Sequence, residues 1–255
     1  SALRGKPRPP KKSPRGRDRR APPGRRGGGG PPPPPPPRHD HSIDQSRIHA
    51  FEMLAGVPLL GGNRCELLIN GDRTFEAIFN AIDRAGRYIL LAFYIIRDDA
   101  IGRALRDRLT AAAARGVTVK ILYDGVGSNW LNRDYIRILQ AARIEVVEFN
   151  ANRRLGSWFQ FNFRNHRKIM VVDGDMGFVG GLNVGDEYMS RNPRFIPWRD
   201  THLQVTGPVV AEIQLAFAED WLWATDWPLD LNWDPRDIDG DTDAVVVAPG
   251  PGDPI

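Results

Sequence analysis

The stretch from Asn165 to Gly174, NHRKIMVVDG, begins with an imidazole and an ammonium two residues apart and then runs into an apolar strand. Side chains two residues apart on a strand share a face, so His166 and Lys168 project together while Arg167 points away. A neutral imidazole is a competent nucleophile, and a lysine binds anionic oxygen through charge-assisted hydrogen bonds. The pair therefore suits chemistry on a phosphate group.

Three further features follow this pair along the chain. Asp173 closes the apolar strand at a turn. Gly180 and Gly181 come next, and glycine lets a backbone approach a ligand closely. Asn183 can donate hydrogen bonds to an oxyanion. With a carboxylate to hold the imidazole in one tautomer, this set suits a tetrahedral phosphate, to which each charge-assisted hydrogen bond contributes about 1.5–3 kcal/mol.

The elements that must position these side chains alternate between strand-like and helix-like patterns. Tyr88–Ile96 is apolar almost throughout, as in a strand covered on both faces, whereas Phe75, Ile78 and Ile82 recur at helical spacing. The expected strands are 65–69, 88–96, 117–123, 144–149, 169–173, 177–179 and 200–205, and the expected helices are 73–85, 100–115, 132–142 and 209–224. This alternation predicts an α/β fold, an α-β-α layered sandwich with helices on both faces of a mixed, mostly parallel sheet.

The charge of the chain is divided unevenly. Residues 1–40 hold 12 of the 35 basic residues but only two of the 31 acidic ones, a net charge of +10, so residues 41–255 carry −6. The same segment holds 13 of the 22 prolines and almost no apolar side chains, which predicts a disordered tail with polyproline II at 31–37. We consider a solvated linker, a tether to anionic lipid headgroups and a nucleic-acid contact, in that order.

Several classes of protein are disfavoured by what the sequence lacks. The single cysteine, Cys65, rules out an internal disulfide. No apolar run is long enough to span a bilayer as a helix, and no hydrophobic signal-peptide core is visible. No glycine-rich nucleotide motif follows a strand, and no cluster has metal-ligand spacing, so we expect neither a cofactor nor a metal.

The ordered set His166, Lys168, Asp173, Gly180, Gly181 and Asn183 resembles the motif of the phospholipase D superfamily, His-x-Lys-(x)4-Asp followed by Gly-[Ser/Gly]-x-Asn. The match, NHRKIMVVDGDMGFVGGLN, has no gap, and its glycine pair is similar to the bacterial cardiolipin synthase branch. Further similar blocks lie at 61–71, 93–99, 115–128, 185–188 and 198–202. The resemblance implies the layered α/β sandwich of that superfamily over roughly residues 50–250.

The resemblance also implies roles for individual residues. His166 would be the nucleophile that forms a phosphohistidine, or else the acid paired with it. Lys168 and Asn183 would bind the phosphoryl oxygens. Asp173 belongs to the motif, and we interpret it as a local structural carboxylate. Asp200 resembles the carboxylate that orients a catalytic histidine, which in this superfamily belongs to the opposite half.

The glycine pair is assigned to the site, whereas Glu187 and His202 remain open between functional and structural interpretations. Gly180 and Gly181 would line the substrate site, and Glu187 is a candidate for a polar role beside it, with a solvated loop residue as the alternative. His202 either faces the site or lies elsewhere on its strand.

The superfamily site contains two such motifs, and this chain has one. A second His-x-Lys is absent, and the ending Ala244–Ile255 looks like the opening strand of a second half. The resulting ranges are a tail (1–40), a linker and leading helix (41–62), a catalytic half (63–240) and the start of a truncated second half (241–255). The second motif would then come from a longer chain, or from a homodimer partner as in single-motif nucleases.

The function implied is transfer of a phosphatidyl group between two phosphatidylglycerol molecules, giving cardiolipin and glycerol. It requires a membrane surface and predicts peripheral association with the cytoplasmic side of the cell membrane. A dimeric single-motif phosphodiesterase or nuclease is one alternative, although the acidic folded part argues against nucleic acid. A non-catalytic half that binds anionic lipid is the other.

Overall fold

The computed structural model describes residues 45–129, 131–149, 165–189, 198–234 and 238–248. The chain divides into two units, 1–42 and 43–255, and all described residues belong to the second. The predicted disordered tail lies outside the described residues. In chain order the elements are α1 (Gln45–Ala55), β1 (Leu60–Ile69), α2 (Asn70–Arg84), β2 (Tyr88–Phe93), α3 (Ala100–Ala114), β3 (Thr118–Asp124), α4 (Arg133–Ala141), β4 (Glu145–Phe149), β5 (Lys168–Val172), β6 (Met176–Gly180), the 3-10 helix η2 (Asp186–Met189), β7 (Thr201–Thr206), α5 (Val210–Thr225) and β8 (Thr242–Ala244).

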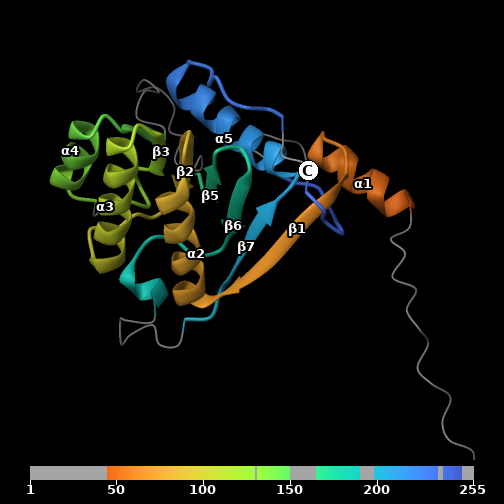
Figure 1. Cartoon of the computed structure of the whole chain (residues 1–255), viewed down its shortest axis with the longest axis horizontal. Helices are drawn as coiled ribbons and strands as arrows, with labels where there is room; N and C mark the ends of the chain where they lie inside the picture. The colour runs from red at the N-terminus through yellow and green to blue at the C-terminus, as the bar shows by residue number, and fades with distance from the viewer. Residues whose placement is uncertain (1–44, 130, 150–164, 190–197, 235–237, 249–255) are drawn as a thin grey trace, which may run out of the picture. The chain divides into compact units, whose positions relative to one another are not determined.

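The strands form one mixed sheet in the order β4-β3-β2-β5-β6-β7-β1-β8 (Figure 1). The layered α/β architecture is as predicted, but the expectation of a mostly parallel sheet is wrong. Parallel pairing joins only β2 to β3 and β3 to β4, and the other five of the seven neighbouring pairs among the described strands are antiparallel. The reason is local: β5 returns directly into β6 through the turn 173–175, and a short turn can join only antiparallel strands.

Helices cover both faces of this sheet because its central strands are apolar on both sides. All six residues of β2 are buried. Leu91 and Met170 pack in the core beneath α2, α3 and α4, whereas Leu90 and Val171 pack against α5 on the other face. Fully burying a side chain of this size contributes about 1.5–3 kcal/mol, so these two cores fix the strands that carry the site.

Strand β1 begins earlier than the sequence pattern predicts, at Leu60 rather than Cys65. The polar Asn63 interrupts the apolar pattern, yet it is fully buried. Its side-chain amide donates to the carbonyl oxygens of Leu60 (2.6 Å) and Thr242 (3.2 Å), and its oxygen accepts from the N–H of Val209 (2.8 Å). These bonds join the start of β1 to β8 and to the start of α5.

The edge strand β8 pairs antiparallel with β1, through Leu60–Ala244 and Asn63–Thr242. The assignment of 241–255 to a second half remains a prediction, and its first strand is here part of the same sheet. Among the described residues no helix is both long and apolar enough to cross a membrane.

The chain segments that form the site lie at one edge of the sheet, where the strands β2 and β3 end and β5 begins. The parallel strands β2 and β3 end there, at Phe93 and Asp124. Strand β5 runs the opposite way, so its first residue, Lys168, pairs with Phe93 at the end of β2. The residues just before β5 therefore lie beside the residues that follow β2.

Candidate active site

His166 lies in the short segment ahead of β5 and its side chain is exposed. Its imidazole stacks on the ring of Tyr94, which follows directly after β2, with 3.9 Å between ring centroids and 31° between ring planes. The ring is therefore held against one face of a neighbour at the surface of the protein.

Lys168 projects to the same side of the sheet edge, as the two-residue period predicts. Its Nζ donates to the carbonyl oxygen of His166 at 2.6 Å and lies 5.5 Å from the centre of the Tyr94 ring. Arg167 points the other way and donates to the carbonyl oxygen of Ala216 on α5. Burial lowers the pKa of Lys168 below its usual 10.5, and the nearby carboxylate of Asp200 opposes that shift.

Asn183 follows β6 and is held almost fully buried. Its Oδ1 accepts from the N–H of Ile95 at 3.1 Å, and its Nδ2 donates to the hydroxyl of Tyr188 at 3.0 Å. An amide nitrogen carries two N–H bonds, so donation to Tyr188 leaves one for a ligand. The amide is thus fixed at the same sheet edge, beyond the end of β2.

Asp200 precedes β7 and is tied to the start of α2. Its backbone oxygen accepts from the N–H of Asn70 at 2.9 Å, and its own N–H donates to the Asn70 side chain at 3.3 Å. Its Oδ1 accepts from the N–H of Thr201 at 2.7 Å, and Trp198 Nε1 lies 3.5 Å from Oδ2. The carboxylate is therefore oriented before any ligand binds.

The glycine pair makes room for two other side chains of the site. That Gly180 and Gly181 also let the backbone approach a ligand stays a prediction, because side chains of the protein fill the space where their own Cβ atoms would lie. A Cβ on Gly180 would lie 2.4 Å from Nδ1 of His202, and one on Gly181 would lie 2.3 Å from Oδ1 of Asp200. The absence of side chains at these two positions lets the imidazole and the carboxylate pack against the backbone.

His202 faces the site from within the sheet. Ile169 pairs with Val179, and Gly180 pairs with His202, so Lys168 and His202 flank Gly180 on one face. The side chain of His202 is buried, its Nδ1 accepts from the N–H of Leu182 at 3.4 Å, and nothing among the described residues bonds to its Nε2.

The buried His202 is electrically neutral at physiological pH. The pKa of His202 is lowered from 6.5 to about 4, chiefly by burial; the charge of Asp200 opposes this shift, and that of Lys168 adds to it. The site therefore holds one exposed and one buried imidazole, which differ in their access to solvent and protons.

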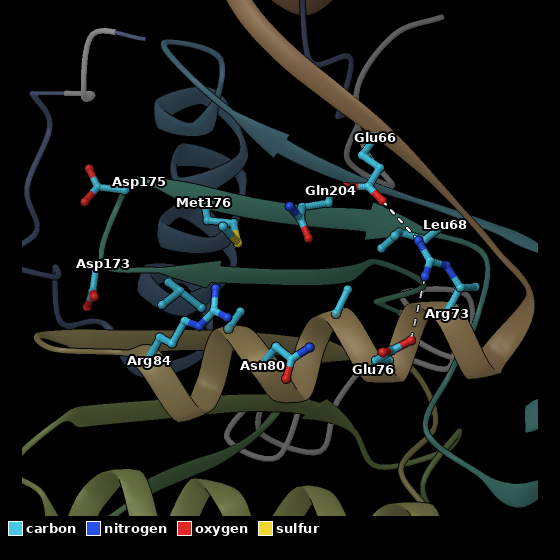
Figure 2. A pocket seen from close by; sticks show the side chains of 13 residues that line it. Glu66, Leu68, Arg73, Glu76, Asn80, Arg84, Asp173, Asp175, Met176 and Gln204 are labelled. Carbon is cyan, nitrogen blue, oxygen red and sulfur yellow. Dashed lines mark hydrogen bonds and ion pairs between the residues drawn. The ribbon is translucent and has the colours of Figure 1, made fainter.

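Asp173 is not brought together with the other motif residues. It lies at the far end of β5, at the turn into β6 (Figure 2), whereas Lys168 begins that strand. Its carboxylate accepts from the backbone N–H groups of Gly86 (2.9 Å), Arg87 (2.7 Å) and Tyr88 (2.9 Å). The side chain holds the connection between α2 and β2, which supports the structural interpretation and separates Asp173 from the catalytic set.

Glu187 is a partner in an ion pair rather than a solvated loop residue. Its Oε1 accepts from Nε (3.1 Å) and NH2 (3.0 Å) of Arg97, and only 14% of its side chain is exposed. The pair fixes η2 against the segment that follows β2. Glu187 therefore helps to fix η2, which carries Tyr188, the hydrogen-bond partner of Asn183.

A cavity of about 420 Å³ lies along α2 on the same face of the sheet as His202. Figure 2 shows Asn80 and Arg84 projecting toward it from α2, with Gln204 and Met176 on the strands opposite. None of the residues gathered around His166 lines this cavity. In the described ranges no group of three or more His, Cys, Asp or Glu side chains is placed to hold a metal ion.

Sequence reasoning missed the contact between Tyr94 and His166. The apolar pattern predicts a strand through Tyr94, but β2 ends one residue earlier. An aromatic residue just past the C-terminal end of a parallel strand was the available signal, because ligands of such sheets bind at that edge.

Comparison with known proteins decides the family. A family model described as "Cardiolipin synthase, PLD-like domain" matches residues 78–221. The chain belongs to this family. The predicted relationship to the phospholipase D superfamily and its cardiolipin synthase branch is thereby confirmed.

Individual relatives agree with this assignment. The chain is 52% identical over 177 residues to a cardiolipin synthase A of Pseudomonas fluorescens and 46% identical over 207 residues to one of Pseudomonas putida. These matches cover 69% and 81% of this chain but 37% and 43% of the relatives, so the chain spans less than half the length of the relatives it matches.

A solved structure supports the fold. The phosphatidylserine synthase of Haemophilus influenzae has a TM-score of 0.52 to this chain at 20% identity, over 74% of this chain and 44% of that one. At this level of identity the likeness concerns the layered α/β fold.

Proposed function

We propose that this chain carries the nucleophile of a phosphatidyltransferase that joins two phosphatidylglycerol molecules into cardiolipin and releases glycerol. The observation that carries the proposal is the exposed imidazole of His166 beside the ammonium of Lys168, at the sheet edge where the Asn183 amide is fixed. The family of the chain narrows the reaction from phosphate chemistry in general to phosphatidyl transfer.

In the first step a ring nitrogen of His166 attacks the phosphorus of one phosphatidylglycerol. The bond from phosphorus to the oxygen of the headgroup glycerol breaks, and that oxygen leaves with a proton as glycerol. In the second step the terminal hydroxyl of another phosphatidylglycerol attacks the phosphohistidine. The phosphorus–nitrogen bond breaks, the hydroxyl proton goes to a base, and cardiolipin leaves.

The side chains around His166 divide the remaining tasks. Lys168 and the second N–H of Asn183 bind the non-bridging oxygens, where charge develops in the transition state. Tyr94 supports the ring of His166 through its stacking contact. Asp200 accepts a hydrogen bond from a second histidine and so fixes the ring orientation of that histidine.

That second histidine has to supply the general acid, whose help is typically worth about 10²–10⁴-fold in rate. This chain matches 37–43% of the length of its relatives and has one His-x-Lys-(x)4-Asp motif. We place the second motif in a second half of a longer protein, with a homodimer partner as the other source.

The lipid substrate places the reaction at a membrane surface. We propose peripheral association with the cytoplasmic side, assisted by the 12 basic residues of segment 1–40. A basic residue near an anionic leaflet contributes about 1 kcal/mol, and residues 41–255 have a net charge of −6, so the tail is the segment suited to this contact.

The experiment is a transfer assay with a form of the protein that spans the length of its relatives. With phosphatidylglycerol labelled in its headgroup, we expect labelled glycerol and cardiolipin in equal amounts. His166→Ala should abolish both products, and Glu219→Gln, an exposed change on α5, should leave both unchanged. Cardiolipin formed by the His166→Ala variant would overturn the proposal.

A further inference from the structure

The residues on either side of His166 share one partner on α5. The side-chain Nδ2 of Asn165 donates to Oδ2 of Asp220 at 2.7 Å. The guanidinium of Arg167 forms an ion pair with Oδ1 of the same carboxylate, also at 2.7 Å. One carboxylate thus spans the position of His166 and uses a different oxygen on each side.

This arrangement is shielded from solvent. The side chains of Arg167 and Asp220 are 19% and 15% exposed, and Asn165 is buried. Arg167 also donates to the carbonyl oxygens of Ala216 (3.0 Å) and Ala248 (2.8 Å), so its guanidinium is fixed from three directions. A half-buried ion pair with this many partners holds its geometry better than a surface pair, which contributes little.

The backbone around His166 is fixed as well. The N–H of Asn165 donates to Oδ2 of Asp124 at the end of β3, at 3.1 Å. The N–H of Arg167 donates to the side-chain oxygen of Asn165 at 3.0 Å. His166 is therefore the middle residue of a three-residue segment whose outer members are anchored to α5, while its own ring lies against Tyr94.

We propose that Asp220 is a positioning residue for His166: by holding both neighbours, it sets the place and direction of the nucleophilic imidazole. The inference rests on the proposed function for its consequence in catalysis but not for its geometry. In this proposal Asp220 acts through Asn165 and Arg167. A displacement of about 1 Å at a reacting group can cost on the order of 100-fold in rate, so loss of the contacts that Asp220 makes with Asn165 and Arg167 should lower kcat.

The competing explanation is that Asp220 only anchors α5 to the sheet. The two explanations differ in what happens to His166 when the protein stays folded. Asn165→Ala provides that case, because it removes the contact of Asn165 with Asp220 and the acceptor of the Arg167 N–H, and leaves the half-buried ion pair between Arg167 and Asp220 in place. Asp220→Asn removes the charge while it keeps the shape, and Glu219→Gln, at the exposed neighbouring position, is the matched control.

The first measurement is NMR of this chain labelled at histidine, with the signal of His166 identified by its loss in His166→Gln. Stacking on Tyr94 shifts the ring protons of His166 away from their position in the unfolded chain. We expect Asn165→Ala and Asp220→Asn to move these signals toward the unfolded position and Glu219→Gln to leave them in place. Thermal unfolding of each variant shows that the change occurs in folded protein.

The second measurement is the rate at which the same variants, made in a form that spans the length of the relatives, form phosphohistidine from phosphatidylglycerol. We expect a fall on the order of 100-fold in kcat for Asp220→Asn, with KM little changed, and a smaller fall for Asn165→Ala. Folded variants with wild-type His166 signals would overturn the inference. If the wild-type protein forms no phosphohistidine, the proposed function fails, while the NMR result still decides whether Asp220 positions His166.

Discussion

Replacing Asp173 tests whether this motif residue acts in stability rather than in chemistry. Alanine at this position would remove the acceptor of three backbone N–H groups, those of Gly86, Arg87 and Tyr88. Buried hydrogen bonds to a charged group contribute about 1.5–3 kcal/mol each, but two of these three are exposed, so about 1 kcal/mol each is appropriate.

The backbone conformation adds a second cost. Asp173 has φ of 57°, in the left-handed region, which costs about 1–2 kcal/mol for a residue such as alanine. Asp173→Ala should therefore lower the free energy of unfolding by about 4 kcal/mol. Asp173→Gly should cost about 3 kcal/mol because glycine accepts the backbone conformation, and Asp173→Asn about 1–2 kcal/mol because it keeps one acceptor oxygen.

The assay is urea unfolding followed by tryptophan fluorescence, which the chain supports with seven tryptophans. The rate of phosphohistidine formation on His166 is measured in the same variants, at temperatures well below their unfolding. We expect wild-type rates in every folded variant, because Asp173 lies a whole strand away from Lys168. A variant of unchanged stability that had lost the reaction would refute this reasoning and return Asp173 to the catalytic set.

Three further predictions follow from other contacts. The pKa of His202 is about 4 in the folded chain and 6.5 in the unfolded chain. The free energy of unfolding should therefore be highest above pH 6.5 and fall by roughly 3 kcal/mol as the pH drops toward 4. Chemical unfolding across that range should show this slope, and His202→Gln should lack it. Gly180→Ala forces a Cβ within 2.6 Å of the His202 backbone and should cost about 1–3 kcal/mol in the same unfolding assay, whereas Gly86→Ala, where a Cβ meets its nearest neighbour at 3.7 Å, should cost nothing. Glu187→Gln leaves the guanidinium of Arg97 without its charged partner and should lower the melting temperature by a few degrees, with KM unchanged in the transfer assay.

The sequence predicted most elements because their patterns are local. The continuous apolar run of β2 and the helical spacing of Phe75, Ile78 and Ile82 in α2 depend only on neighbouring residues. Strand direction was predicted wrongly because it depends on which strands pair. The short turn 173–175 indicates the antiparallel pair of β5 and β6, but no local pattern shows that β5 pairs antiparallel with β2 or that β1 lies between β7 and β8.

The sequence motif predicted which residues form the site, but not the contacts that hold them in place. The period of a strand predicts that His166 and Lys168 project together, and in the structure both lie against the ring of Tyr94. The space beside Gly181 could not be assigned to the Asp200 carboxylate, because that contact joins residues on different segments. The partners of Asn165 and Glu187 lie 55 and 90 positions away in the chain, so nothing near them in the sequence indicates either contact.

The most direct test of the account is to look for phosphorus bound to His166 itself. A form of the protein that spans the length of its relatives would be incubated with phosphatidylglycerol, quenched in base, digested and examined by mass spectrometry for a peptide that carries the phosphatidyl group. We predict an acid-labile adduct on His166 that is absent in His166→Ala and persists in Asp173→Asn. An adduct on another residue, or its persistence in His166→Ala, would contradict the assignment of the nucleophile.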